Sequence, residues 1–323
     1  MTRVVLAESL KSARRDLDFE RSMLGAGVEL VQYACDGDED RLIAACKDAE
    51  VVLTAYSPMT RNVIEQLSQC ELISITATGF GNVDLEAAAD AGIRVCAVDE
   101  YCTEEVADHA VLLMLALCRR LPEYHQQVQV ERQWQFDSLR GLSRMRDLTL
   151  GIVGFGRIGQ AVARRAQGFG LAIMAFDPYP NDELIADLGA RYCTLEALYC
   201  HADIISLNCG LTADNQHLVD KAAFEQMKRK PLIINCARGA LIDEEAMVNA
   251  LDTGQISGAG LDVLDDESPD LSSSKLIGRK NVILTPHVAF YSDASVQENR
   301  RISTANVRNF LDGKDDDVRR FVL

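Results

Sequence analysis

The sequence of 323 residues lacks the features that mark nucleic-acid-binding and membrane proteins. Its 33 Lys and Arg are outnumbered by 49 Asp and Glu, which gives a formal net charge of −16. A surface without basic excess does not favour general binding of nucleic acid or of anionic membranes. The longest apolar run, residues 110–118, is far too short to cross a bilayer. We therefore expect neither a nucleic-acid nor a membrane partner.

Motifs for metal binding and for nucleophilic catalysis are also missing. None of the ten cysteines forms a C-x-x-C pair, and no H-E-x-x-H spacing occurs. No G-x-S-x-G elbow presents a serine nucleophile. Most cysteines lie in or beside apolar runs, where a thiol packs as a small apolar group, and the N-terminal segment lacks a signal-peptide pattern. We expect a reduced, cytoplasmic protein without a metal.

Apolar runs of strand length alternate with helical segments along most of the chain. This alternation predicts parallel sheets covered by helices on both faces, and the length predicts two domains. The expected strands are residues 4–7, 28–33, 51–55, 72–77, 94–97, 204–208, 232–235, 258–263 and 282–285. The predicted fold class is α/β, with two doubly wound parallel-sheet domains.

A longer helix is predicted over residues 104–121, with Thr103 as its N-cap and Pro122 just beyond its end. Its apolar centre suggests a buried connector between the two domains. The polar segment 125–146 follows and contains the only tryptophan, Trp134. We expect this segment to be less regular and able to pack on a partner subunit.

The most informative stretch is a glycine-rich turn between an apolar run and a helical segment. Gly154, Gly156 and Gly159 form the pattern G-x-G-x-x-G. In this context the first glycine makes a tight turn, the second admits a pyrophosphate close to the backbone, and the third lets the helix pack on the strand. The pyrophosphate would lie at the start of the helix, near Arg157 and Ile158.

Asp177 discriminates between the two nicotinamide cofactors. It ends the next apolar run, where its carboxylate would accept hydrogen bonds from the adenosine ribose hydroxyls. A 2′-phosphate would meet a negative charge there, and residues 178–182 include no arginine or lysine to bind it. The sequence therefore predicts NAD rather than NADP.

Three side chains lie at the ends of expected strands of the second half or in the turns that follow, where open α/β sheets bind their ligands. Arg238 precedes a glycine, and its guanidinium can bind a carboxylate through two bonds, although a surface arginine is the alternative. Asp262 interrupts an apolar strand and needs a specific partner. His287 stands in a strand-end turn. The other histidines lie on or beside helical or polar segments and are expected to have no catalytic role: His109, His125, His201 and His217.

A second glycine-containing turn lies in the first half. Gly79 and Gly81 follow an apolar run, so their backbone N–H groups can point toward an anion. An ordinary strand-to-helix turn is an equal alternative. Tyr56 and Ser57, which follow the expected strand 51–55, are further candidates for a substrate pocket.

Taken in order, these motifs resemble those of the D-isomer-specific 2-hydroxyacid dehydrogenases. The resemblance rests on residues 79–84, 151–159, 235–239, 261–263 and 286–287. Residues 209–212 and 287–292 look most like the C-terminal-binding-protein branch, which includes transcriptional corepressors. The resemblance implies a homodimer with an NAD-binding Rossmann domain over residues 102–288. Residues 1–101 and 289–323 would form a discontinuous, flavodoxin-like substrate-binding domain.

The resemblance also implies roles for individual residues. Arg238 would bind the substrate carboxylate and carbonyl oxygen and stabilise the charge that grows on that oxygen. His287 would be the acid/base, and a nearby Glu267 carboxylate would favour its imidazolium form. Asp262 would help to hold the nicotinamide carboxamide. The expected cofactor contacts are Gly154, Gly156, Arg157, Ile158, Gly159, Asp177, Cys209, Ala237 and Asp262. The expected substrate contacts are Tyr56, Thr78, Gly79, Phe80, Gly81 and Phe290.

Two positions depart from the family pattern. The glutamate usually stands directly before a proline, but Ser268 separates Glu267 from Pro269, which leaves Asp266 as an alternative partner of the histidine. Phe290 stands where the corepressor branch typically has a tryptophan, so the pocket is expected to admit a different 2-oxo side chain. We predict an NAD-dependent D-2-hydroxyacid dehydrogenase. A dinucleotide-sensing, corepressor-like binding protein and a phosphite dehydrogenase are the alternatives.

Overall fold

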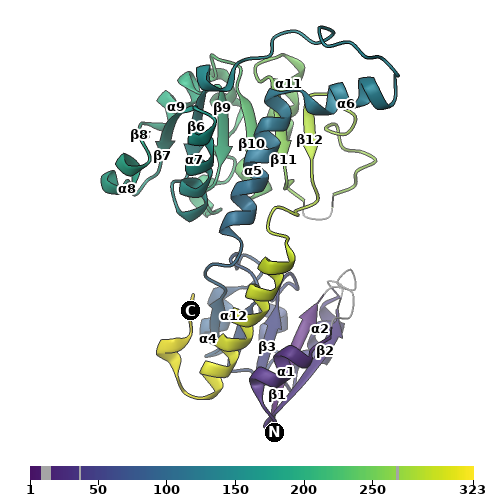
Figure 1. Cartoon of the computed structure of the whole chain (residues 1–323). Helices are drawn as coiled ribbons and strands as arrows, with labels where there is room; N and C mark the ends of the chain where they lie inside the picture. The colour runs from purple at the N-terminus through teal and green to yellow at the C-terminus, as the bar shows by residue number, and fades with distance from the viewer. Residues whose placement is uncertain (9–15, 36–37, 267–268) are drawn as a thin grey trace. The chain divides into compact units, whose positions relative to one another are not determined.

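The computed structural model describes residues 1–8, 16–35, 38–266 and 269–323, and it divides into two compact units. The first unit consists of Met1–Tyr101 and Ser292–Leu323, and the second of Cys102–Tyr291. The chain therefore leaves the first unit and returns to it through its C-terminal helix (Figure 1). The predicted division after residue 288 lies three residues before the division after Tyr291. Among the described helices, none has both the length and the apolar composition needed to cross a membrane.

The first unit is built on a five-stranded parallel sheet with the order β2-β1-β3-β4-β5. Its strands are β1 (Thr2–Glu8), β2 (Val28–Ala34), β3 (Val51–Thr54), β4 (Leu72–Ile75) and β5 (Arg94–Ala97). This is the strand order of flavodoxin-type sheets, which confirms the predicted fold class. Every residue of β3 and β4 is buried, as expected for central parallel strands covered on both faces.

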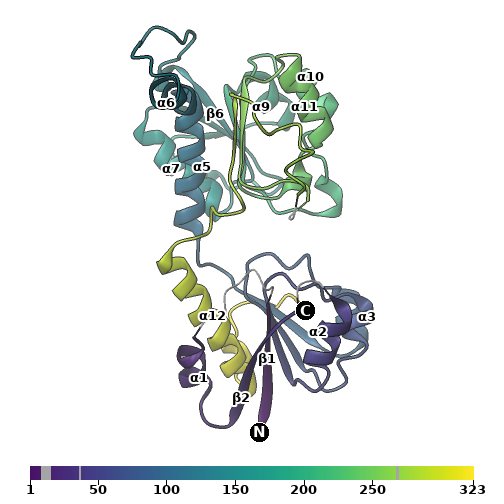
Figure 2. The same ribbon diagram turned by 90° about the vertical axis from the view of Figure 1, so that its right-hand side faces the viewer.

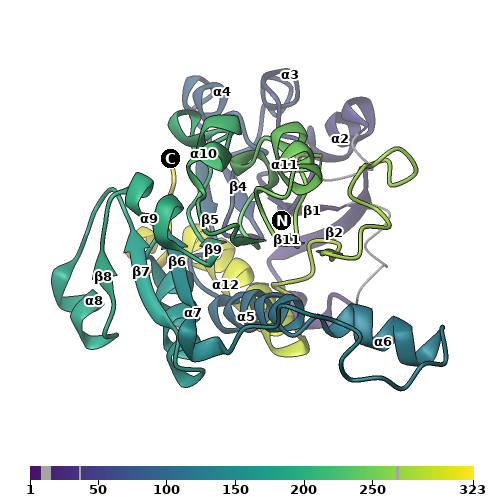
Figure 3. The ribbon, with the colours of Figure 1, turned by 90° about the horizontal axis from the view of Figure 1, so that it is seen from above.

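Helices cover both faces of this sheet (Figure 2). The helices are α1 (Asp18–Leu24), α2 (Glu39–Cys46), α3 (Arg61–Ile64), α4 (Leu85–Asp90) and α12 (Asp293–Leu311), with the short 3-10 turn η4 (Asp315–Asp317). Figure 3 shows α2, α3 and α4 side by side over one face. On the other face, α12 is tied to α1 by Arg300, whose Nε and Nη2 each lie 2.7 Å from a carboxylate oxygen of Glu20. The returning helix is thus fixed to the N-terminal half by an ion pair.

The second unit is built on a seven-stranded parallel sheet with the order β12-β11-β10-β9-β6-β7-β8. Its strands are β6 (Thr149–Val153), β7 (Ala172–Phe176), β8 (Arg191–Tyr192), β9 (Ile204–Leu207), β10 (Leu232–Asn235), β11 (Gly258–Leu261) and β12 (Val282–Leu284). Counted from β6, this is the Rossmann order with one strand added beyond the sixth. The order reverses between β6 and β9, and ligands of such sheets bind outside the carboxyl ends of the strands at that point.

Two helices, α5 (Thr103–Cys118) and α7 (Arg157–Gly168), pack on one face of this sheet. The opposite face carries α9 (Leu195–His201), α10 (Lys221–Gln226) and α11 (Glu244–Asp252). The unit also contains α6 (Leu121–Gln129), α8 (Asp182–Asp187), η1 (Met145–Asp147), η2 (Ala213–Asn215) and η3 (Gly239–Leu241). Helix α5 packs on α7, β10 and β11, so it belongs to the core of the second unit rather than connecting the two units.

Two local predictions were wrong. Thr103 is the first residue of α5 and does not cap it, because the N-cap position is Cys102 and no side chain accepts a hydrogen bond there. A second helix, α6, begins where the predicted helix was expected to end, and it extends into the segment 125–146 that was expected to be less regular. Pro122 stands in its first turn, where the missing N–H is not needed. Arg120 has a left-handed conformation (φ 51°), which ends α5 and allows α6 to begin.

Candidate active site

The glycine loop between β6 and α7 contains two crowded glycines and one open one. Gly154 has φ 89°, and a Cβ there would lie 2.7 Å from the backbone nitrogen of Cys209. A Cβ on Gly159 would collide with the carbonyl of Gly154 and lie 3.2 Å from Ile152 Cγ2. By contrast, no atom lies within 4 Å of the Cβ position of Gly156. The fold requires the first and third glycines, whereas the second leaves open space at the start of α7.

Asp177 follows β7 and holds the glycine loop. Its Oδ2 accepts a hydrogen bond from the Phe155 N–H (2.7 Å), and its Oδ1 accepts one from the Tyr179 N–H (2.9 Å). A carboxylate has about four acceptor positions, so two remain for a ligand. Asp177 borders a cavity of about 530 Å³, which Pro180 and Tyr192 also line. The acid therefore fixes the loop and retains capacity for ribose hydroxyls.

The loop after β9 closes against the glycine loop. Burial raises the pKa of the Cys209 thiol to about 11, so the thiol is neutral near pH 7. Asn208 donates two hydrogen bonds to Ser206, but its buried Oδ1 has no partner among the described residues. An unsatisfied buried acceptor costs about 1–3 kcal/mol, which a donor on a bound molecule would offset. The open glycine, the remaining acceptors of Asp177 and this orphaned oxygen fit a dinucleotide.

Arg238 follows β10 in an extended conformation, with φ −140° and ψ 140°. Asn235 fixes the turn, because its Oδ1 accepts from the Ala237 N–H (3.0 Å) and its Nδ2 donates to the Arg238 carbonyl (2.8 Å). The Arg238 Nη1 donates to the carbonyl of Ala237 (2.7 Å). Within the described ranges no carboxylate forms an ion pair with Arg238, so its charge remains available for an anionic ligand.

His287 lies in the turn after β12, and Asp262 holds that turn. His287 has a left-handed backbone (φ 52°), and its N–H donates to the carbonyl of Asp262 (2.8 Å). The carboxylate of Asp262, which is 1% exposed, accepts from the N–H groups of Val288 (2.9 Å) and Ala289 (2.8 Å). The ring of Phe290 meets the imidazole edge to face, with centroids 6.1 Å apart. The orientation of the histidine is therefore set by its turn and by an aromatic neighbour.

The strand register brings Arg238 and His287 to the same level. Asn235 of β10 pairs with Leu261 of β11, which in turn pairs with Leu284 of β12. Arg238 and His287 each follow this level by three residues (238 − 235 and 287 − 284), on opposite sides of β11. A guanidinium and an imidazole therefore flank one strand at the edge of the sheet where Rossmann folds bind their ligands.

The acidic turn after β11 is only partly described. Glu267, the predicted partner of His287, lies outside the described residues, as does Ser268. Asp266, the alternative partner, is described and exposed. The choice between the two acids therefore stays a prediction.

In the first unit, the predicted substrate residues follow β3 and β4. Tyr56 is 57% exposed, residues 78–80 are half-buried and Gly81 is exposed. The two loops are joined, because Asn82 Nδ2 donates to the carbonyl of Ser57 (3.0 Å). Tyr56 and the glycine turn therefore lie at one edge of this sheet.

Known proteins resemble this chain over most of its length. A family model described as D-isomer specific 2-hydroxyacid dehydrogenase, NAD binding domain, matches residues 111–289. D-lactate dehydrogenase of Escherichia coli (strain K12) is 36% identical over 269 residues, which cover 79% of this chain and 81% of that protein. The chain belongs to the D-isomer specific 2-hydroxyacid dehydrogenase family.

Two further proteins resemble this dehydrogenase. Hydroxypyruvate reductase of Blautia hydrogenotrophica is 34% identical over 281 residues, which cover 85% of this chain and 86% of that protein. The crystal structure of D-lactate dehydrogenase from Aquifex aeolicus, complexed with NAD and lactic acid, matches with a TM-score of 0.89 at 29% identity and covers 98% of each chain. The dehydrogenase is thus an NAD-dependent oxidoreductase that interconverts 2-oxo acids and D-2-hydroxy acids.

The sequence did not indicate two residues that the structure places against predicted site residues. His109 of α5, which was expected to have no role, has its Nε2 2.9 Å from Thr285 Oγ1 in the turn before His287. Arg320 Nη1 donates to the carbonyl of Thr78 (3.1 Å) in the glycine turn of the first unit. Each lies far along the chain from its partner, so no local pattern marks either of them.

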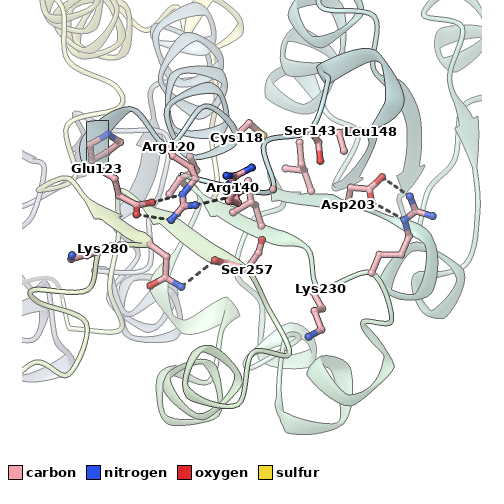
Figure 4. Close-up of a pocket in the computed structure, with 17 residues that line it drawn as sticks. Cys118, Arg120, Glu123, Arg140, Ser143, Leu148, Asp203, Lys230, Ser257 and Lys280 are labelled. Carbon is pink, nitrogen blue, oxygen red and sulfur yellow. Dashed lines mark hydrogen bonds and ion pairs between the residues drawn. The ribbon is translucent and has the colours of Figure 1, made fainter. Parts of the chain in front are cut away.

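A second cavity of the dehydrogenase lies at the amino ends of the strands in the second unit (Figure 4). It measures about 440 Å³ and is lined by residues that precede or begin strands, such as Leu148. Two of its cations are paired, Arg120 with Glu123 (2.6 Å) and Arg229 with Asp203 (2.7 Å). None of the predicted site residues lines it. In the part of the chain that the structure describes, no group of three or more His, Cys, Asp or Glu side chains is arranged to hold a metal ion.

Proposed function

We propose that this dehydrogenase reduces a small 2-oxo acid, and that Arg238 and His287 are the groups that contact it. The observation that carries the proposal is the common level of these two residues on opposite sides of β11. Arg238 has no described carboxylate partner, and the backbone of His287 is fixed by Asp262. Two of the relatives are a D-lactate dehydrogenase and a hydroxypyruvate reductase, so pyruvate and hydroxypyruvate are the first substrates to test.

In the proposed chemistry, Arg238 stabilises negative charge and His287 transfers the proton. The Arg238 guanidinium binds the substrate carboxylate and the carbonyl oxygen, and it stabilises the negative charge that develops on that oxygen. The His287 imidazolium, paired with Glu267, donates a proton to the same oxygen and takes it back in the oxidative direction. When bound, the nicotinamide cofactor supplies the hydride.

We assign the cofactor contacts to the residues predicted from the sequence. The open space at Gly156 supports a pyrophosphate at the start of α7, where backbone N–H groups and the helix dipole favour an anion. Asp262 Oδ2 accepts one hydrogen bond, from Ala289, which leaves an acceptor for the carboxamide. The full set is Gly154, Gly156, Arg157, Ile158, Gly159, Asp177, Cys209, Ala237 and Asp262.

We assign substrate selection to the first unit together with Phe290. The exposure of Tyr56 and the position of the turn 78–81 at the carboxyl end of β4 support this assignment. In this proposal residues 102–288 bind NAD, and residues 1–101 with 289–323 bind the substrate. A phenylalanine at 290 selects among 2-oxo side chains because its ring packs beside His287.

The test is an NADH-oxidation assay with a panel of 2-oxo acids: glyoxylate, pyruvate, hydroxypyruvate, and branched and aromatic members. We expect turnover with at least one small member, and loss of turnover in Arg238→Ala and in His287→Ala while NADH binding is retained. Phosphite with NAD is assayed in parallel. No turnover on any member, with NADH still bound, would refute the proposal.

Within the family, we propose a relationship to the C-terminal-binding-protein branch. It is supported by residues 209–212 and 287–292 of the sequence and is weakened by Phe290. The relatives compared above are dehydrogenases and a reductase, so they give no support to a corepressor function or to phosphite oxidation. A Phe290→Trp variant tests the relationship, since it restores the branch residue and should narrow the range of 2-oxo acids accepted.

We further propose a homodimer formed through α6 and the segment that follows it. Four large apolar side chains are exposed there: Leu121 (57%), Val130 (71%), Trp134 (91%) and Phe136 (90%). Adjacent apolar side chains exposed to this degree are typical of a surface that a partner covers. Light scattering should give twice the 35.6 kDa chain mass, and Trp134→Ser with Phe136→Ser should give the single mass. A monomeric wild-type protein would refute this proposal.

We also propose that the protein is cytoplasmic. None of the ten cysteines forms a disulfide, and a chain with so many cysteines and no disulfide is typical of a reducing compartment. Fractionation of the source cells with an antibody to the protein tests this, and recovery in an extracytoplasmic fraction would contradict it.

A further inference from the structure

A histidine of α5 contacts the turn that carries His287. The side chain of His109 is 16% exposed, and its Nε2 lies 2.9 Å from Thr285 Oγ1 and 3.6 Å from Asp262 Oδ1. The side chain of Asp262 is fully buried. All these residues belong to the second unit, where α5 packs against β11 and β12. His109 is thus built into the framework of the turn.

In this chain of hydrogen bonds, His109 donates to Thr285 and Thr285 donates to Asp262. Three donors converge on the Asp262 carboxylate: the Thr285 hydroxyl (2.5 Å) and the N–H groups of Val288 and Ala289. In all three bonds a carboxylate oxygen of Asp262 is the acceptor, so Thr285 gives its only hydroxyl hydrogen to Asp262. Thr285 Oγ1 must then accept from His109. Nε2 of His109 therefore carries a hydrogen, whether the ring is neutral or charged.

This chain of bonds restrains His287 through the backbone of its turn. The N–H of His287 donates to the Asp262 carbonyl, so the backbone of Asp262 and the backbone of the turn are held together. His287 itself has φ 52°, a conformation that is strained for a non-glycine residue and persists only where its surroundings impose it. A shift of Thr285 or Asp262 would relax the turn and re-aim the imidazole.

We propose that His109 is a positioning residue, which orients His287 for proton transfer through Thr285 and Asp262. The inference rests on the proposed acid/base role of His287. His109 donates a hydrogen bond to the Thr285 hydroxyl and stands beside the buried Asp262 carboxylate. It therefore restrains both partners of the Thr285–Asp262 hydrogen bond, which lies at the start of the turn. Misplacement of a catalytic group by about 1 Å can lower a rate about 100-fold.

The test compares two variants at position 109. His109→Gln keeps an N–H donor near the position of Nε2, whereas His109→Leu has similar bulk and no donor. We expect His109→Leu to lower the single-turnover rate of NADH oxidation about 10- to 100-fold, with Kd for NADH and the melting temperature little changed. His109→Gln should restore the rate to within about threefold of wild type. His201→Leu, an exposed histidine on α9, is the matched control and should have no effect.

Thr285 provides an independent pair of variants that does not alter α5. Thr285→Val removes the hydroxyl and should reproduce the loss seen in His109→Leu, while Thr285→Ser should retain most of the rate. Because the two residues act through one hydrogen-bond chain, the double variant His109→Leu with Thr285→Val should lose no more than the larger single loss. A multiplicative loss in the double variant would overturn the proposal.

The outcomes separate this inference from the proposed function. If the wild-type protein has no turnover, or if His287→Ala keeps full activity, the proposed function fails. If His287 is essential but His109→Leu turns over at the wild-type rate, only the positioning role fails. Equal losses in His109→Leu and His109→Gln, accompanied by a lowered melting temperature, would show a purely structural role and overturn the inference.

Discussion

Replacing Gly156 with alanine separates cofactor binding from folding. Gly156 is the N-cap of α7, with φ −73° and ψ −163°, a conformation that alanine adopts without strain. No atom lies within 4 Å of the position its Cβ would take. Alanine is a poorer N-cap than glycine by about 1 kcal/mol, and its smaller unfolded-state entropy offsets part of that cost. For a unit of this size we expect a change in melting temperature of at most about 4 °C.

The same substitution should strongly weaken NADH binding. The added methyl group would occupy the open space through which a pyrophosphate reaches the first N–H groups of α7. Loss of one hydrogen bond to a charged group corresponds to about 1.5–3 kcal/mol. The dissociation constant for NADH, measured by fluorescence titration, should therefore rise about 10- to 100-fold.

The matched control for Gly156→Ala is Gly168→Ala, the same substitution at the last residue of α7. Gly168 also has no atom within 4 Å of its Cβ position, but it lies at the other end of the helix. We expect wild-type NADH affinity from this control. Wild-type affinity in Gly156→Ala as well would refute the assignment of the pyrophosphate to the glycine loop.

Three further predictions follow from individual contacts. Arg238→Lys keeps the charge but loses the planar fork, so kcat/KM should fall about 10- to 100-fold with unchanged NADH affinity, and wild-type kinetics would contradict the role of Arg238. Arg300→Met removes the ion pair with Glu20, whose side chain is 3% exposed, and should lower the free energy of unfolding by about 3 kcal/mol in urea titration. Arg301→Met, which breaks an exposed pair with Glu298, should change it by less than about 1 kcal/mol. Burial raises the pKa of the Cys209 thiol to about 11. The rate of its alkylation, followed by mass spectrometry, should therefore increase about tenfold per pH unit between pH 8 and 10, and a rate that levels off near pH 8 would contradict this.

Most strands could be predicted because a parallel strand that is buried on both faces consists of consecutive apolar residues. The predicted runs 51–55 and 232–235 agree within one residue with β3 and β10, whose central residues are buried. Strand β8 was missed because its two residues, Arg191 and Tyr192, form no apolar run. Helix α6 was missed because Pro122 was taken as the end of a helix, although proline is equally compatible with the first turn of a new one.

Arg238, Asp262 and His287 could be proposed as site residues from the sequence because each stands within three residues of the end of a strand. His109 could not be found in this way, because its partner Thr285 lies 176 residues away and a helical histidine gives no local signal. Arg320 and Thr78 are 242 residues apart, which is again a purely tertiary contact. Glu267 remains a prediction from the sequence.

The most direct test of the account is the stereochemistry of the product. The protein is incubated with NADH and the 2-oxo acid of the panel that it turns over best, and the hydroxy acid formed is resolved by chiral chromatography. The account predicts the D enantiomer alone, and no product above background from His287→Ala or Arg238→Ala with NADH still bound. Formation of the L enantiomer, or undiminished product from either variant, would contradict it.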